Sequence, residues 1–84
     1  MQPMTIRVRF FAILKDKAGR GSVDLELSPG ATVADALTLL SDSEVELVTW
    51  LPKVATAVNR EYAAHDRVLN EGDELALIPP VSGG

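Results

Sequence analysis

Two alternations of apolar and polar residues open the chain and predict a pair of β-strands, over residues 5–11 and 22–27. The apolar positions of the first alternation are Ile6, Val8 and Phe10. They share one face, because successive side chains of a strand point to opposite sides. A helical turn over residues 14–18 and two glycines separate the strands. We therefore expect an antiparallel hairpin with a long connection.

Apolar residues at helical spacing follow a Ser-Pro-Gly turn. Thr32 and Asp35 have the spacing of a capping box, in which each side chain bonds to the other residue's backbone N–H. We therefore predict a helix over residues 33–40. A second, short helix is predicted over residues 44–51, and Pro52 ends it because proline has no backbone N–H to donate.

The rest of the chain reads as extended segments: a strand over residues 55–58, a turn over 59–61, a brief stretch over 62–64 and a last strand over 74–78. Pro79 and Pro80 end the pairing of the last strand, because neither has an N–H. The order of the elements, a hairpin followed by a helix and then by further strands, predicts one α+β domain over residues 1–78. In such a domain the helix packs on one face of the sheet. Residues 79–84 form a tail.

The composition excludes several classes of function. The 84 residues carry a formal net charge of −4, which repels phosphate backbones and anionic lipid, so we expect neither nucleic acid nor a membrane as a partner. The chain has no cysteine and a single histidine, His65, which leaves no disulfide, no cysteine nucleophile and no metal site built on thiolates or histidines. The start of the chain has no signal-peptide pattern, and we expect a cytoplasmic protein.

The tail has the composition of a segment that threads a narrow channel. The paired prolines keep it extended, Val81 offers an apolar anchor, and Ser82, Gly83 and Gly84 add almost no bulk. A carboxylate exchanges oxygen for sulfur only after activation by ATP to an acyl-adenylate, from which AMP leaves when sulfur attacks. In a chain without cysteine, carried sulfur must be a thiocarboxylate on Gly84. The alternative is an inert, frayed end.

Strand parity predicts an apolar cluster on the sheet face that points away from the core. Phe11 has the parity of the arginines of the first strand, and Ile78 has the parity opposite to the inward leucines of the last strand. If the two strands are neighbours, Phe11 and Ile78 lie at the root of the tail, and Tyr62 can join them. Such a cluster with a charged rim is typical of a protein interface. The alternative is that the chain's own loops cover these side chains.

Four segments carry a more specific resemblance: residues 8–12 (Val-Arg-Phe-Phe-Ala), 31–37 (Ala-Thr-Val-Ala-Asp-Ala-Leu), 57–59 (Ala-Val-Asn) and 72–84, which end in Pro-Pro-Val-Ser-Gly-Gly. Together they resemble the small subunits of molybdopterin synthase, the sulfur carriers of molybdenum cofactor biosynthesis. The resemblance implies a ubiquitin-like β-grasp fold. That fold has a mixed sheet of four to five strands, one main helix and a short second helix, and its first and last strands lie side by side.

The same resemblance implies a set of partners and roles. A ubiquitin-activating-like adenylyltransferase uses ATP to adenylate Gly84, and a sulfurtransferase supplies the sulfur. The thiocarboxylated tail, with Gly83, Ser82 and Val81 as its threading segment, enters the large subunit of a heterotetrameric synthase and donates sulfur to precursor Z. The chain by itself binds no cofactor and has no catalytic set of its own.

Three other functions use or ignore the same terminus. A sulfur carrier for thiamine thiazole synthesis shares the chemistry, although that family lacks the paired prolines. A ubiquitin-like protein modifier joins its terminal glycine to lysines after the same activation. A plain interaction domain would leave the tail inert, and removal of its last two glycines would change nothing.

Overall fold

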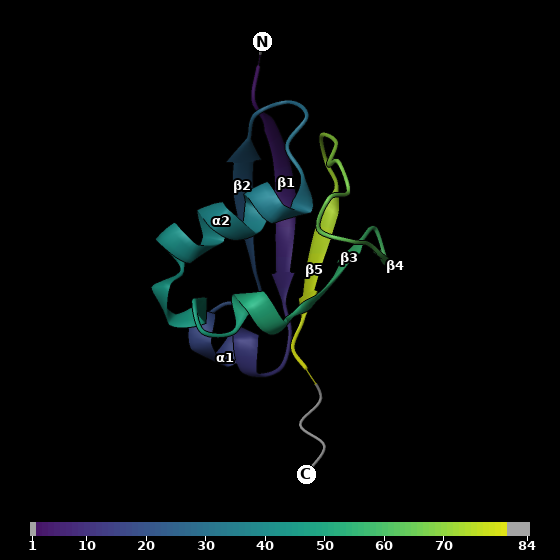
Figure 1. Cartoon of the computed structure of the whole chain (residues 1–84). Helices are drawn as coiled ribbons and strands as arrows, with labels where there is room; N and C mark the ends of the chain where they lie inside the picture. The colour runs from purple at the N-terminus through teal and green to yellow at the C-terminus, as the bar shows by residue number, and fades with distance from the viewer. Residues whose placement is uncertain (1, 81–84) are drawn as a thin grey trace.

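The computed structural model describes residues 2–80. Helices lie between the strands in the first part of the chain, and three strands follow one another at its end (Figure 1). The elements are β1 (Met4–Phe10), α1 (Ile13–Ala18), β2 (Ser22–Leu27), α2 (Val33–Ser43), the 3-10 turns η1 (Val45–Leu47) and η2 (Leu51–Lys53), β3 (Ala55–Val58), β4 (Glu61–Tyr62) and β5 (Glu74–Ile78).

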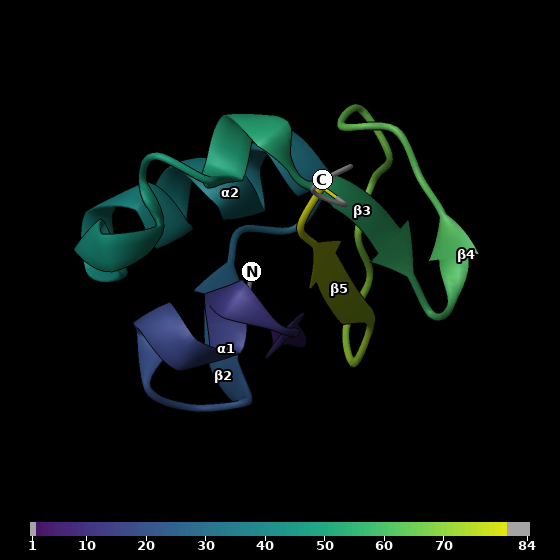
Figure 2. The same ribbon diagram turned by 90° about the horizontal axis from the view of Figure 1, so that it is seen from below.

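The strands form one mixed sheet in the order β2-β1-β5-β3-β4. β1 pairs antiparallel with β2 and parallel with β5, and β3 pairs antiparallel with β5 and β4. The first and last strands therefore lie side by side, as expected for a β-grasp sheet. Seen from below, α2 and the 3-10 turns lie on one side of the sheet (Figure 2). The predicted α+β architecture is confirmed.

The core fills the space between α2 and the inner face of the sheet. The inward positions of paired strands line up across the sheet, because Val8 is registered with Leu75 and Phe10 with Leu77. Full burial of a valine or leucine side chain stabilises the fold by about 2 kcal/mol. The largest fully buried side chains are Ile6, Leu14, Leu40, Leu47, Leu69, Leu75, Leu77, Val8, Val33 and Val58.

The capping box at the start of α2 is present. Thr32 N–H donates to Asp35 Oδ2 at 2.8 Å, and Asp35 N–H donates to Thr32 Oγ1 at 3.3 Å. The helix continues to Ser43, three residues beyond the predicted end. Ser41 and Ser43 fit there because their hydroxyls donate to backbone carbonyls one turn earlier, which satisfies these polar groups inside the helix.

The predicted helix over residues 44–51 is wrong. Glu44 leaves helical geometry with φ −120° and ends α2, and the chain then makes two separate 3-10 turns. Pro52 lies inside the second turn rather than after a helix. It is tolerated there because the first N–H groups of a helical turn need no partner within that turn.

Strand ends differ from the prediction by one or two residues. β1 runs over Met4–Phe10 instead of 5–11, so Phe11 lies just beyond it. β4 runs over Glu61–Tyr62 instead of 62–64. The turn before β4 is tight, because Asn59 and Arg60 have φ angles of 51° and 74°, and Glu61 already belongs to the strand. Two-residue turns with positive φ at both positions match the twist of a hairpin.

A buried carboxylate joins the β3–β4 turn to the loop before β5, at the end of the sheet where β5 begins. Asp73 accepts from Asn59 Nδ2 at 2.9 Å and from Asn70 N–H at 2.8 Å. Asn59 Oδ1 in turn accepts from Glu74 N–H at 2.9 Å, and the Asp73 carbonyl accepts from Arg7 N–H. The network fixes the start of β5 against β1 and the β3–β4 turn.

Candidate functional site

The root of the tail lies at the end of the sheet where β1 and β5 both finish (Figure 1). Phe10 and Leu77 are registered partners in this parallel pair. Phe11 is the residue after Phe10, and Ile78 is the residue after Leu77. Pro79 comes directly after β5 and is half-buried. The predicted site residues of the tail, Val81, Ser82, Gly83 and Gly84, lie outside the described residues.

The sheet face opposite α2, here called the outer sheet face, gathers the other predicted residues. Registered pairs place Tyr62 beside Ala57, Ala57 beside Ala76 and Ala76 beside Arg9, in one row across four strands. A second row pairs Ala55 with Ile78. We restrict the name outer sheet face to its part near the tail root and β3, which consists of Arg9, Phe11, Ala55, Ala57, Tyr62, Ala76 and Ile78.

Apart from Arg9, these residues are apolar, with small side chains between large ones. Phe11 is 38% exposed and Tyr62 is 79% exposed, while Ile78 is half-buried. Phe11 and Ile78 lie together at the tail root, whereas Tyr62 is on the edge strand beyond the alanines. A shallow hollow of about 390 Å³ adjoins Tyr62 and Ala55. The surface therefore has two exposed aromatic side chains, Phe11 and Tyr62, with alanines between them.

Two ion pairs lie on this side of the sheet. Arg9 Nη1 lies 3.8 Å from Glu74 Oε2, and Arg7 Nε donates to Asp24 Oδ1 at 3.2 Å. The Arg9 guanidinium carbon also lies 5.2 Å from the centre of the Phe11 ring, a cation–π geometry. Strand parity places Arg9 on the rim, but its contact with the ring depends on the turn after β1 and was missed.

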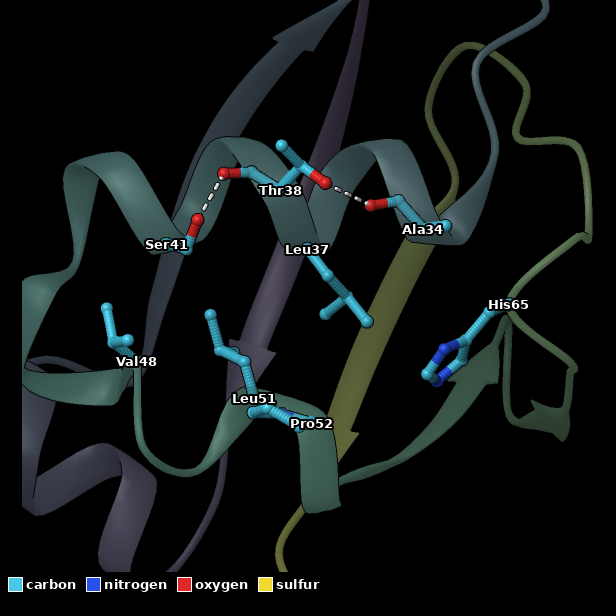
Figure 3. A pocket seen from close by; sticks show the side chains of 8 residues that line it. All are labelled: Ala34, Leu37, Thr38, Ser41, Val48, Leu51, Pro52 and His65. Atoms are coloured by element: carbon cyan, nitrogen blue, oxygen red, sulfur yellow. Dashed lines mark hydrogen bonds between the residues drawn. The ribbon is translucent and has the colours of Figure 1, made fainter.

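A groove of about 350 Å³ opens on the helical side of the molecule (Figure 3). Its hydroxyl groups are satisfied within α2, because Thr38 Oγ1 donates to the Ala34 carbonyl and Ser41 Oγ to the Thr38 carbonyl. None of the predicted site residues lines it. The lining residues are Ala34, Leu37, Thr38, Ser41, Val48, Leu51, Pro52 and His65.

His65 lines this groove (Figure 3) and also the hollow beside Tyr62 and Ala55. Its backbone carbonyl accepts from Ala34 N–H at 2.8 Å, in the first turn of α2. The position is that of a loop residue packed beside a helix. Among residues 2–80, no three histidine, cysteine or carboxylate side chains gather as a metal site would require. Within the same range, no helix is long and apolar enough to cross a membrane.

Comparisons with known proteins agree on one family. The sequence profile of the ThiS family matches residues 8–84. The molybdopterin synthase sulfur carrier subunit of Chlamydomonas reinhardtii is 35% identical over 83 residues, which cover 96% of this chain and 100% of that protein.

Solved structures give the same result. SAMP1 from Haloferax volcanii is 34% identical with a TM-score of 0.84, over 95% of this chain and 99% of that one. A chain from the complex of subunits 1 and 2 of the molybdopterin-converting factor of Helicobacter pylori is 27% identical with a TM-score of 0.70, over 96% and 100%. Because profile, sequence and fold match over nearly the whole length, the chain belongs to the ThiS family of ubiquitin-like β-grasp proteins and is a relative of the molybdopterin synthase sulfur carrier subunits.

Proposed function

We propose that this protein carries sulfur as a thiocarboxylate on Gly84 and donates it within a molybdopterin synthase. The similarity to a sulfur carrier subunit, which covers all of that protein and 96% of this chain, is the observation that carries the proposal. The sequence supports it independently, because a chain without cysteine that continues from β5 into Pro-Pro-Val-Ser-Gly-Gly offers sulfur no other covalent attachment.

The proposed loading reaction has two steps. An activating enzyme transfers AMP from ATP to the Gly84 carboxylate, and pyrophosphate leaves. A sulfide equivalent from a sulfurtransferase then attacks the carbonyl carbon. The new carbon–sulfur bond forms as the carbon–oxygen bond to AMP breaks, and AMP leaves with the electron pair. After sulfur has been donated, an oxygen from water restores the carboxylate.

The outer sheet face is the proposed docking surface for the large synthase subunit. Its apolar side chains flank the root of the tail, so a partner that covers Phe11 and Ile78 also receives the residues after Pro80. Aromatic side chains with an apolar surround are typical of the centre of an interface. The Helicobacter pylori complex, in which the similar chain is bound to subunit 2, supports a partner of this kind.

Mass spectrometry tests the loading reaction directly. The protein is incubated with ATP, the activating enzyme and a sulfurtransferase, and its intact mass and fragments are measured. We expect one oxygen to be replaced by sulfur, with the change localised to Gly84, and no change when ATP is omitted. An unchanged mass, in a reaction whose partners load another carrier, would contradict the proposal.

Protein modification is the second candidate, favoured by the likeness to SAMP1, a small archaeal modifier. Both functions need an activated Gly84 and differ in what attacks it. The last basic residue of the chain is Arg67, so trypsin would leave residues 68–84 attached to a modified lysine. Peptides branched with this segment would support a modifier, and their absence beside a detected thiocarboxylate would support the carrier.

A further inference from the structure

Ala12 has a backbone conformation that glycine normally occupies. Its φ is 50° and its ψ is −125°, a combination in which the Cβ of an L-residue is crowded. The Phe11 carbonyl accepts from Leu14 N–H at 3.0 Å, so residues 11–14 form a β-turn with Ala12 at its second position. These angles are those of a type II′ turn, whose second position is dominated by Gly, Asn and Asp.

The strained turn fixes the backbone of Phe11 from both sides. Phe10, the last residue of β1, is buried, and so is Leu14 in the first turn of α1. The Phe11 carbonyl accepts from Lys15 N–H at 3.4 Å in addition to Leu14 N–H. The exposed Phe11 is therefore held between two anchored neighbours. Strain that persists in a folded structure is concentrated at functional positions.

A second, independent contact fixes the ring. The Arg9 guanidinium carbon lies 5.2 Å from the centre of the Phe11 ring, and the same guanidinium is 3.8 Å from the Glu74 carboxylate. An exposed aromatic side chain is otherwise free to change rotamer, and that freedom is lost when a partner buries it. The Glu74 carboxylate holds the Arg9 guanidinium, and the guanidinium holds the Phe11 ring. These contacts restrict the rotamer of the ring before any partner binds.

We infer that Ala12 and Arg9 are positioning residues, which hold Phe11 preorganised for an apolar pocket of the partner. The inference rests on the proposed docking of the outer sheet face. Glycine at position 12 would form the same turn without strain but would allow the backbone at Phe11 a wider range of angles. Alanine keeps the range of backbone angles at Phe11 narrow. The strain at Ala12 therefore comes with a defined direction for the Phe11 ring.

Binding and stability should therefore respond to Ala12→Gly in opposite directions. We expect the melting temperature to stay equal or rise, because the strain is relieved. We expect the Kd for the large subunit, measured by calorimetry, to rise about threefold to tenfold, which corresponds to ordering one side chain on binding. If Ala12 had a purely structural role, the substitution would weaken binding only where it also lowered the melting temperature.

A double-mutant cycle assigns the effect to the ring. Phe11→Ala should raise the Kd roughly tenfold or more, as for a central aromatic contact, with little loss of stability. In the Phe11→Ala background, Ala12→Gly and Arg9→Gln should have no further effect on the Kd. Arg7→Gln is the matched control, because Arg7 pairs with Asp24 on the same side of the sheet and should not couple to Phe11.

The outcomes separate the inference from the proposed function. If Phe11→Ala binds as tightly as the wild type, the proposed docking surface is wrong and the inference falls with it. If Phe11→Ala weakens binding but Ala12→Gly does not, the docking surface stands and the positioning role is overturned. Equal effects of Ala12→Gly with and without the Phe11 ring would also overturn it.

Discussion

At the scale of single residues, two glycines of this fold should respond differently to the same substitution. Gly72 has a φ of +83° with open space around it, while an added Cβ at Gly21 meets Lys15 Cε at an ordinary 3.7 Å. Gly72→Ala should therefore lower the free energy of unfolding by about 1–2 kcal/mol through backbone strain alone. Gly21→Ala should change it little. Urea denaturation of both variants measures the difference, and equal losses would contradict this account.

Asn59 combines a backbone role with a side-chain role. It has positive φ, its amide donates to the buried Asp73 carboxylate and its amide oxygen accepts from Glu74 N–H. Asn59→Ala should lower the free energy of unfolding by about 2–3 kcal/mol, because a buried carboxylate loses a donor and alanine is less tolerant of this conformation.

Asn70→Ala is the control for this prediction, since Asn70 reaches Asp73 through its backbone N–H. That hydrogen bond survives the substitution, and the change in stability should stay within the range of surface substitutions, about 0.5 kcal/mol. Thermal or chemical unfolding of both variants provides the measurement. A loss at Asn70 as large as that at Asn59 would show that the side-chain bonds are unimportant.

Strand parity is sufficient to predict which face a residue occupies but not how it is held. The outward direction of Phe11 and Ile78 follows from alternation alone, because their neighbours Phe10 and Leu77 are core residues. The conformation of Ala12 could not be predicted, since alanine is not a residue that indicates a type II′ turn. The contact of Arg9 with the Phe11 ring depends on that turn and was missed with it.

At the scale of elements, the capping box of α2 can be tested by the same change, threonine to alanine, at two positions of the helix where we expect different effects on stability. Thr32→Ala removes the acceptor of Asp35 N–H and should lower the free energy of unfolding by about 1 kcal/mol. Thr38 lies exposed in the same helix, and Thr38→Ala should be neutral or stabilising because alanine is the better helix former. Destabilisation of similar size at both sites would argue against the capping role.

The segment after α2 shows where element prediction from local pattern fails. Val45, Val48 and Leu51 have helical spacing, yet the chain forms two short 3-10 turns there. Arg20 Nη2 donates to the nearly buried Glu44 carboxylate at 2.7 Å. This pair joins residues 24 positions apart and accompanies the break at Glu44. A contact between distant residues carries no local signal, whereas the Thr32–Asp35 box is local and was predicted.

At the scale of the whole molecule, sheet order is what places the predicted residues together. Neighbouring positions for β1 and β5 could not be deduced from periodicity, and the expectation came from resemblance to a known fold. The parallel register, with Phe10 beside Leu77, then brings Phe11 and Ile78 to the same end of the sheet as the tail root. Tyr62 reaches the same face through a two-residue strand, too short for a pattern of its own.

The proposed division into a folded domain and a reactive tail leads to a final prediction, for the variant that lacks Gly84. The described core lies between Met4 and Leu77, so the variant should have the melting temperature and circular dichroism spectrum of the wild type. Its loading with sulfur should be abolished, because the carboxylate then belongs to Gly83 and lies one residue short of the activating site.

Ser82→Ala is the matched control for the truncation, since it alters the tail without shortening it and should still load. Mass spectrometry after the ATP-dependent reaction compares the three proteins. Normal loading of the truncated chain would remove Gly84 from the mechanism. A truncated chain that no longer folds would mean that the tail contributes to the core, contrary to the position of β5's last residue, Ile78, at the edge of the packed region. The carrier proposal requires that the truncated variant fold normally and fail to load. In that case the domain presents the tail, and the chemistry depends on the length of the tail.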